Sequence, residues 1–153
     1  MLPRKLYHAS FRKVNELKPG FQVTKKLVKW DISETNRFLY AVDDRETVEF
    51  LGLGSAIEKM VLIDRYQVRE DKIIVHISEG SHPPSMEQIY ALEVYIYTIT
   101  PGPEQLWIKN NNKHNGLDNE WKTKSIIQAR SFKVEKMNVR MFLRDKELSF
   151  IEA

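Results

Sequence analysis

The longest apolar run of the chain, residues 89–100 with the sequence IYALEVYIYTIT, is the feature that most restricts the fold. It is rich in β-branched and aromatic residues. Its residues fall into two alternating sets, and the set that contains Glu93 is the less apolar one. Pro101 and Pro103 cannot continue a β-ladder, so they end the run. The run therefore predicts a long central strand of a β-sheet, with one face less apolar than the other.

Seven shorter apolar or β-branched runs predict further strands. They are residues 5–10, 37–42, 72–78, 105–109, 120–127, 129–137 and 139–144. The last three are expected to close an antiparallel sheet. Polar or turn-rich segments separate the runs at residues 12–35, 79–85 and 110–119. The pattern predicts an α+β fold with six to eight mostly antiparallel strands.

One helix is predicted directly after the run at residues 37–42. Asp43 can cap its N-terminus, and Glu46 follows three residues later, as in a capping box. The helix would continue to Leu53, but Gly52 and Gly54 weaken helical structure. We therefore expect one or two short or broken helices in the N-terminal half of the chain.

The composition narrows the class of protein. A length of 153 residues suits a single domain over residues 1–153. The chain has no cysteine, which excludes disulfides, thiol catalysis and cysteine-ligated zinc. No apolar run approaches the roughly 20 residues that span a bilayer, and the N-terminus lacks the apolar stretch of a signal peptide. We therefore expect a cytoplasmic protein with no membrane partner.

The charge pattern leaves the partner open. The formal net charge is +3, and lysines cluster at residues 25–29 and 109–113. Such clusters are usually solvated, but they can also attract a phosphate-bearing ligand or nucleic acid.

Four histidines are candidates for chemistry: His8, His76, His82 and His114. No two of them have the i, i+4 spacing of a helical metal site, so no metal is predicted. His8 and His76 each begin a His-x-Ser sequence on a predicted strand. If these two strands paired, one histidine would act as a base and the other as an acid on a phosphate, as in a two-histidine phosphoesterase.

Three short segments and the predicted helix carry a second pattern. YHAS supplies His8 and Ser10, FLYAV supplies Tyr40, and NEW supplies Glu120. The helix between the second and third segments adds Thr47 and Phe50. Each segment is short, so the information lies in their order along the chain.

This order resembles the ADP-ribosyltransferase superfamily, in particular its diphtheria-toxin-like and poly(ADP-ribose)-polymerase-like branch, which carries a histidine, a tyrosine and a glutamate on three strands. His8 and Glu120 match the histidine and the glutamate. Ala9 stands where the family usually has glycine. Leu39 stands where it has the tyrosine, so Tyr40 falls on the following phenylalanine. The resemblance covers about residues 6–135 and implies a split β-sheet, NAD as the substrate and no metal.

The resemblance also implies a role for each matched residue. Cleavage of the nicotinamide–ribose bond builds positive charge on the ribose, which a carboxylate stabilises. The implied catalytic residues are Glu120, which would stabilise this charge, and His8, which would hold a ribose hydroxyl. The implied NAD-contacting residues are His8, Ser10, Tyr40, Thr47 and Phe50, of which Ser10 and Thr47 would reach the carboxamide and Phe50 would stack on the pyridine ring.

The implied activity is NAD-dependent ADP-ribosyl transfer or NAD glycohydrolysis. The acceptor stays open between protein, nucleic acid, a small molecule and water. A non-catalytic module that binds NAD or ADP-ribose on the same scaffold is one alternative, and the phosphoesterase with His8 and His76 is another. Glu120→Gln should abolish the first activity, and His76→Ala should abolish the last.

Overall fold

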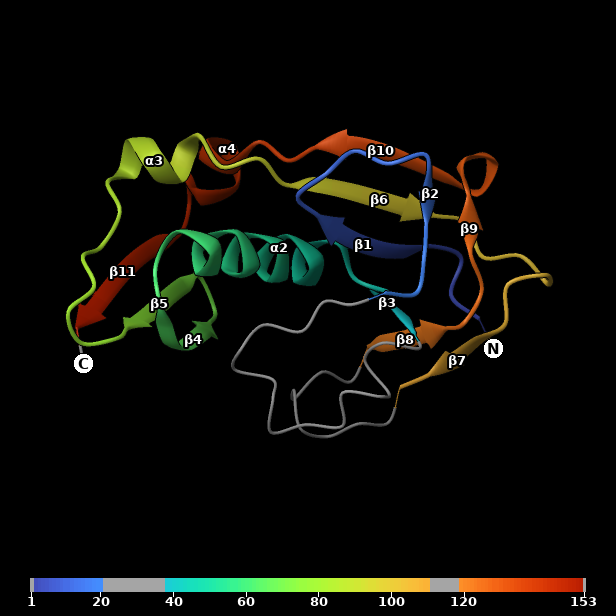
Figure 1. The fold of residues 1–153 in the computed structure, drawn as a ribbon, viewed down its shortest axis with the longest axis horizontal. Coiled ribbons are helices and arrows are strands. Elements are labelled where there is room, and N and C mark those ends of the chain that lie inside the picture. The colour runs from blue at the N-terminus through green and yellow to red at the C-terminus, as the bar shows by residue number, and fades with distance from the viewer. Residues whose placement is uncertain (1, 21–37, 111–118, 153) are drawn as a thin grey trace. The chain divides into compact units, whose positions relative to one another are not determined.

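The computed structural model describes residues 2–20, 38–110 and 119–152, and it has an α+β architecture with mostly antiparallel sheets, as predicted. Figure 1 labels the elements along the chain. The strands are β1 (Leu6–Ser10), β2 (Glu16–Leu17), β3 (Leu39–Val42), β4 (Ile63–Arg69), β5 (Lys72–Ile77), β6 (Tyr95–Ile99), β7 (Trp107–Lys109), β8 (Glu120–Thr123), β9 (Ile127–Gln128), β10 (Phe132–Lys136) and β11 (Glu147–Glu152). The helices are α2 (Arg45–Met60), α3 (Met86–Tyr90), α4 (Val139–Leu143) and the 3₁₀-helix η3 (Ala129–Ser131).

The largest sheet has six strands in the order β10-β6-β1-β3-β8-β7. Strand β3 lies between β1 and β8 and is antiparallel to both, with Val42 opposite Tyr7 on one side and opposite Glu120 on the other. Strands β7 and β8 are also antiparallel, with Trp107 opposite Thr123. The predicted strands at residues 5–10 and 37–42 therefore form neighbouring strands of one sheet.

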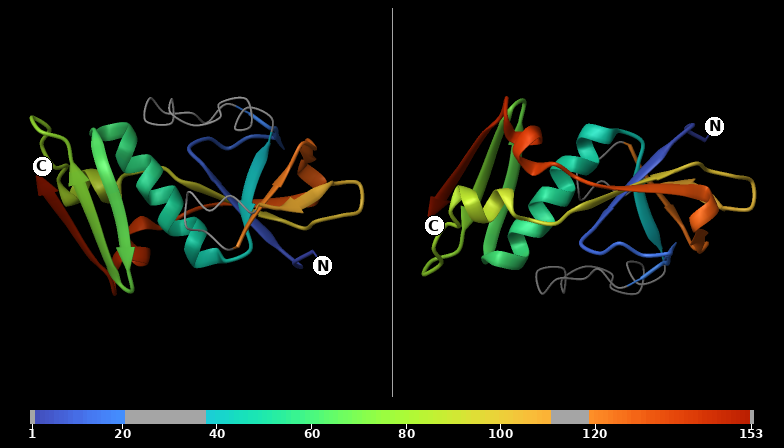
Figure 2. Two further views of the ribbon diagram at one scale, coloured as in Figure 1. Left: turned by 90° about the horizontal axis from the view of Figure 1, so that it is seen from below. Right: turned by 90° about the horizontal axis from the view of Figure 1, so that it is seen from above.

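Two smaller sheets complete the β-structure. Strands β11, β5 and β4 form a three-stranded sheet in which β11 is parallel to β5, and Figure 2 shows the three strands side by side in both views. Ile73, Val75 and Ile77 of β5 are fully buried, which agrees with the alternation of the predicted strand at residues 72–78. Strands β2 and β9 form a two-stranded sheet.

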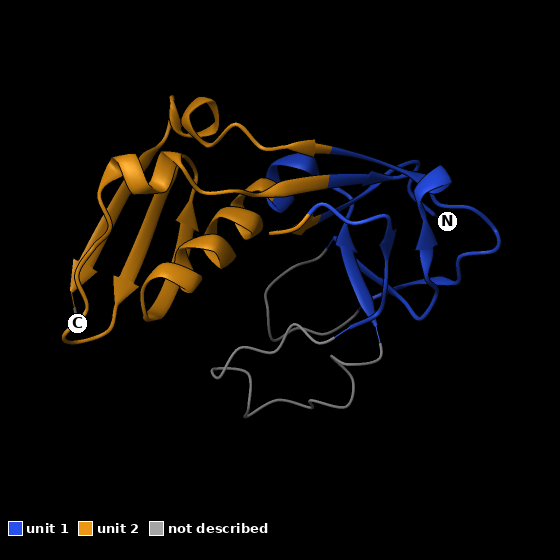
Figure 3. Ribbon diagram, turned by 45° about the horizontal axis from the view of Figure 1, so that its top comes forward, with its two compact units in different colours: residues 1–8, 13–48, 97–134 blue, residues 9–12, 49–96, 135–153 orange. Residues whose placement is uncertain are grey.

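The chain divides into two compact units, coloured separately in Figure 3. Unit 1 contains residues 1–8, 13–48 and 97–134, and unit 2 contains residues 9–12, 49–96 and 135–153. Four of the five boundaries fall within β1, α2, β6 and β10, and the fifth lies between β1 and β2. By sequence, unit 1 carries 15 lysines and arginines against nine acidic residues, whereas unit 2 carries nine against 12. The positive charge of the chain therefore belongs to unit 1.

Helix α2 is longer than predicted, because it runs unbroken through Gly52 and Gly54. A Cβ atom on Gly52 would lie 2.8 Å from Cγ1 of Val94, and one on Gly54 would lie 2.9 Å from the ring of Tyr66. The hydroxyl of Tyr66 donates to the carbonyl of Phe50 in the same helix at 2.9 Å. The two glycines thus permit close packing, and this packing outweighs their low helix propensity.

The strand predicted at residues 89–100 was wrong in part, and the strand predicted at residues 139–144 was wrong as a whole. Residues 89 and 90 belong to α3, which begins with a full capping box formed by Ser85 and Gln88. Strand β6 covers only residues 95–99. Residues 139–143 form α4, whose N-cap Asn138 accepts from the backbone N–H of Met141. Val139, Phe142 and Leu143 are buried at helical spacing. Local capping decides the structure of both segments.

Strands β2, β4 and β11 were not predicted. In β4 most residues are half-buried or exposed, so the strand lacks a regular apolar alternation. Strand β11 pairs with β5, which is remote from it in the sequence. Among the described residues, no helix is long and apolar enough to cross a membrane.

A substitution at Gly52 tests the packing of α2. Gly52→Val should lower the free energy of unfolding by about 1–3 kcal/mol, because the new side chain would overlap Val94 and Ala9. Ser55→Val is the matched control, since Ser55 is an exposed residue of the same helix. Chemical denaturation followed by circular dichroism measures both variants. Equal losses of stability in the two variants would refute close packing at Gly52.

Candidate functional site

His8 lies in the middle of β1 and is 7% exposed. Its Nδ1 atom is 2.8 Å from the backbone carbonyl oxygen of Tyr40 in β3. A carbonyl oxygen can only accept, so Nδ1 carries the proton and donates this hydrogen bond. In the neutral ring this leaves Nε2 with a lone pair that can accept a hydrogen bond.

Burial lowers the pKa of His8, and the hydrogen bond to the Tyr40 carbonyl opposes this shift to a smaller extent. The imidazole is therefore neutral at pH 7. Its ring centroid lies 6.2 Å from that of Tyr97, a fully buried residue whose hydroxyl accepts from the backbone N–H of Val14. The surroundings of His8 are those of a core residue with one specific hydrogen bond.

The three motif segments occupy three adjacent strands. His8 is in β1, Tyr40 in β3 and Glu120 in β8, and β3 pairs with both of its neighbours. The sequence order of the motifs alone did not require this arrangement. The resemblance implied only that the three residues lie on separate strands, which they do.

The pleat of the sheet, however, places His8 and Glu120 on opposite faces. Tyr7, Val42 and Glu120 stand directly opposite one another, and successive side chains of a strand alternate between faces. We call the face of Leu39, Ala41 and Thr123, which are all buried, the inner face. The face of Tyr40, Ile108 and Lys122 is the outer face. His8 belongs to the inner face and Glu120 to the outer face, so the expected slot with both side chains on one face of the sheet is wrong.

Glu120 is the first residue of β8 and is half-buried. Asn110, which is 5% exposed, donates from Nδ2 to Oε1 of Glu120 at 2.5 Å. The backbone N–H of Asn110 also donates to the carbonyl of Glu120 at 2.9 Å. Asn110 thus holds the carboxylate through a side-chain bond and a backbone bond. It was not predicted as a site residue, although the strands predicted on either side of the polar segment 110–119 could have indicated a hairpin that places it opposite Glu120.

A hydrogen-bonded network surrounds the start of α2. Asp44, rather than the predicted Asp43, caps the helix, because its carboxylate accepts from the backbone N–H of Thr47 at 2.9 Å and from its hydroxyl at 2.6 Å. Asn119 donates to Oγ1 of Thr47 at 3.3 Å. Asp43 accepts instead from the indole N–H of Trp121 at 3.2 Å. The hydroxyl proton of Thr47 is therefore engaged, and its oxygen can act towards a ligand as an acceptor.

Tyr40 reaches His8 through its backbone carbonyl, whereas its ring belongs to the outer face and lies 6.2 Å from that of Phe38. The two remaining predicted residues, Ser10 and Phe50, fall in unit 2. Ser10 accepts from the backbone N–H of Arg12 at 3.3 Å. Phe50 is 8% exposed and packs edge-on against Phe142 at a centroid distance of 5.0 Å. Phe50 is therefore a core residue of unit 2, and its surroundings do not support the predicted stacking on the pyridine ring of NAD.

The strand pairing that a two-histidine phosphoesterase needs is absent. The neighbours of β1 in its sheet are β6 and β3, whereas those of β5, which carries His76, are β11 and β4. His76 contacts Arg65 at 3.2 Å and Gln67 at 3.1 Å, both from β4. His114 lies outside the described residues. Within the described ranges, no three histidine, aspartate or glutamate side chains are grouped so as to hold a metal ion.

The comparisons with known proteins add no relative. A scan against protein-family models, a search of the curated proteins and a search of the solved structures each found no match to this chain. The resemblance to ADP-ribosyltransferases therefore depends on the motifs and on the strands that carry them.

The lowered pKa of His8 predicts a pH dependence of stability. Because the pKa of His8 is lowered in the folded chain, the unfolded chain binds a proton at this histidine more readily than the folded chain as the pH falls through about 6.5. The free energy of unfolding should therefore fall as the pH drops from about 6.5 to 5, by at most about 1.4 kcal/mol per pH unit from this residue. His8→Gln should remove this part of the slope in denaturation measured across the range. His82→Gln, at an exposed loop position, is the control. A slope unchanged by His8→Gln would contradict the assignment.

Proposed function

We propose that this chain is an NAD-dependent ADP-ribosyltransferase or NAD glycohydrolase. The observation that carries the proposal is the placement of the three motif segments on the adjacent strands β1, β3 and β8. Cleavage of the nicotinamide–ribose bond needs a group that stabilises an oxocarbenium-like ribose and a group that holds the sugar. Glu120 and His8 are the residues to which we assign these two roles.

The protonation state of His8 suits its role. With Nδ1 bonded to the Tyr40 carbonyl and the ring neutral, Nε2 accepts a hydrogen bond from a ribose hydroxyl. A neutral imidazole also adds no positive charge next to the ribose cation. An imidazolium at this position would oppose the reaction.

The carboxylate of Glu120 must act from the end of the sheet. Val42 is the last residue of β3 and Glu120 the first of β8, and the level of His8 is one residue, or roughly 3.3 Å, further along the strands. A ribose that contacts both residues must therefore lie across this end, where the network of Asp43, Thr47 and Asn119 is also found. Asn110 would keep the carboxylate oriented during the reaction.

A second candidate is a module that binds NAD or ADP-ribose without turnover. The separation of His8 and Glu120 by the pleat favours this candidate, because binding needs fewer groups at one atom than catalysis does. The buried ring of Phe50 favours it as well. The absence of cysteine fits the reducing cytoplasm, which is the location that we propose for either function.

Substitution of Glu120 separates the two candidates. In the enzyme, Glu120→Gln should lower the rate of nicotinamide release from NAD by a factor of about 10² or more, because the charge that stabilises the ribose cation is lost. The dissociation constant for NAD should change little, since the amide retains the size of the carboxyl group. Chromatography of nicotinamide and isothermal titration calorimetry measure the two quantities.

Glu104→Gln is the matched control, because Glu104 is exposed and carries the same charge in the same unit. Equal rates in the wild type and in Glu120→Gln would refute the catalytic role. Binding of NAD with no release of nicotinamide in the wild type, with or without a cell lysate as a source of acceptors, would establish the second candidate instead. No binding of NAD at all would refute both.

A further inference from the structure

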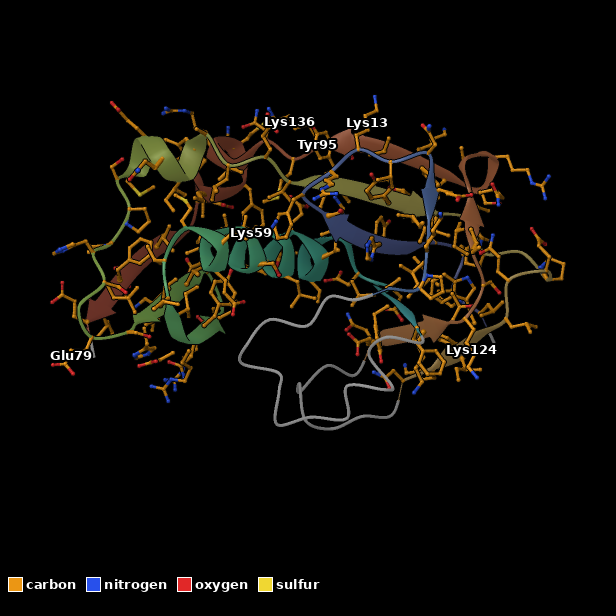
Figure 4. All side chains as sticks on the ribbon, in the orientation of Figure 1. Lys13, Lys59, Glu79, Tyr95, Lys124 and Lys136 are labelled. Atoms are coloured by element: carbon orange, nitrogen blue, oxygen red, sulfur yellow. The ribbon has the colours of Figure 1, made fainter. Side chains whose placement is uncertain are left out.

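The outer face of strands β3, β8 and β7 carries aromatic and basic side chains together. Tyr40 stands directly opposite Lys122, and Lys122 stands opposite Ile108. Phe38 directly precedes β3, and Lys124 directly follows β8, which places both at the next level along the strands. Figure 4 labels Lys124 at the end of β8. All of these residues belong to unit 1.

The two lysines gather at one ring. The Nζ atom of Lys122 lies 4.5 Å from the centroid of Phe38, and that of Lys124 lies 5.6 Å from it. The ring of Tyr40 is 6.2 Å away, tilted by 58°. Both ammonium groups therefore lie beside the same aromatic ring and bring two positive charges to this level of the outer face.

The aliphatic stems of the two lysines could serve only to cover the ring of Phe38, but this explanation does not account for the whole outer face. Such a cover would also shield the neighbouring apolar side chains from water. Instead, Ile108 is 51% exposed, and Leu106, which precedes β7 by one residue, is 74% exposed. Glu120 is the acidic residue of β8 on this face; it lies two residues before Lys122, and Asn110 holds its carboxylate. The outer face thus combines aromatic rings, exposed apolar side chains and two neighbouring lysines.

We propose that the outer face binds single-stranded nucleic acid. Lys122 and Lys124 would contact phosphates, and Phe38 and Tyr40 would offer rings on which unpaired bases stack. The net charge of +6 over the sequence of unit 1, against −3 for unit 2, matches a polyanion. In a duplex the bases are already stacked on one another, so they do not stack on Phe38 and Tyr40. An acidic protein segment has no bases that could stack on these rings. This inference does not depend on turnover of NAD.

Fluorescence anisotropy with a labelled oligothymidylate of about 15 nucleotides tests the proposal on the full chain. Lys122→Gln with Lys124→Gln should weaken binding and reduce the slope of log K against log salt by about 1.4, the value for two lost phosphate contacts on a single strand. The control is Lys13→Gln with Lys133→Gln, which removes the same charge from exposed positions of unit 1. Lys13 precedes β2, and Lys133 is in β10, at the other edge of the six-stranded sheet.

Phe38→Leu tests the stacking. It keeps an apolar side chain but removes the ring, and it should weaken single-strand binding about tenfold. Unfolding midpoints equal to that of the wild type confirm that each variant is folded. Absence of binding in low salt at a protein concentration of about 100 µM would overturn the proposal. Equal affinity for a duplex with no effect of Phe38→Leu, or an equal loss in the control variant, would also overturn it.

Discussion

The hydrogen bond from the imidazole of His8 to the carbonyl of Tyr40 is the interaction on which the arrangement of the motifs depends. It joins β1 to β3 at the centre of the six-stranded sheet, and it gives a partner to a backbone carbonyl beside the core. Because the carbonyl can only accept, the bond also fixes the tautomer of a ring that burial keeps neutral. One contact therefore ties together the strand order, the protonation state of His8 and the hydrogen-bonding capacity of its second nitrogen.

The sequence predicted those parts of the fold in which side-chain alternation and local turn signals agree. Residues 5–10, 37–42 and 72–78 have clear patterns, and they contain β1, β3 and β5. Residues 89–100 have an equally apolar pattern, but the capping box of Ser85 and Gln88 turns their first residues into a helix. Asn138 does the same for residues 139–143. The capping signals were present in the sequence, and they outweighed β-propensity, which depends strongly on context.

The sequence predicted that His8, Tyr40 and Glu120 lie on separate strands, but it did not predict the faces of the sheet to which their side chains belong. A motif gives the residue type and the order along the chain, whereas the face of a side chain depends on the register, and a shift of one residue reverses it. Here the pairing of Tyr7, Val42 and Glu120 sends the carboxylate outward and His8 inward. The support that Asn110 gives to Glu120 depends on the register between β7 and β8, which the motif does not contain. Phe50 shows the same limit, because helical spacing cannot tell a ligand-facing ring from a ring packed against Phe142.

The pleat thus places His8 on the face opposite to the charged residues of β8. The inner face holds a histidine that is neutral because charging it there would cost solvation free energy, whereas the outer face holds Glu120, Lys122 and Lys124 at half-buried or exposed positions, where water solvates their charges. In the proposed reaction, the cationic transition state needs the carboxylate of the outer face, and the proposed sugar binding by His8 needs the inner face. The two requirements meet at the end of the sheet where β3 stops and β8 begins. Under the proposed function, a substrate that uses both residues must cross that end, so the reach of the substrate around the edge would limit the reaction more than the identity of the two side chains.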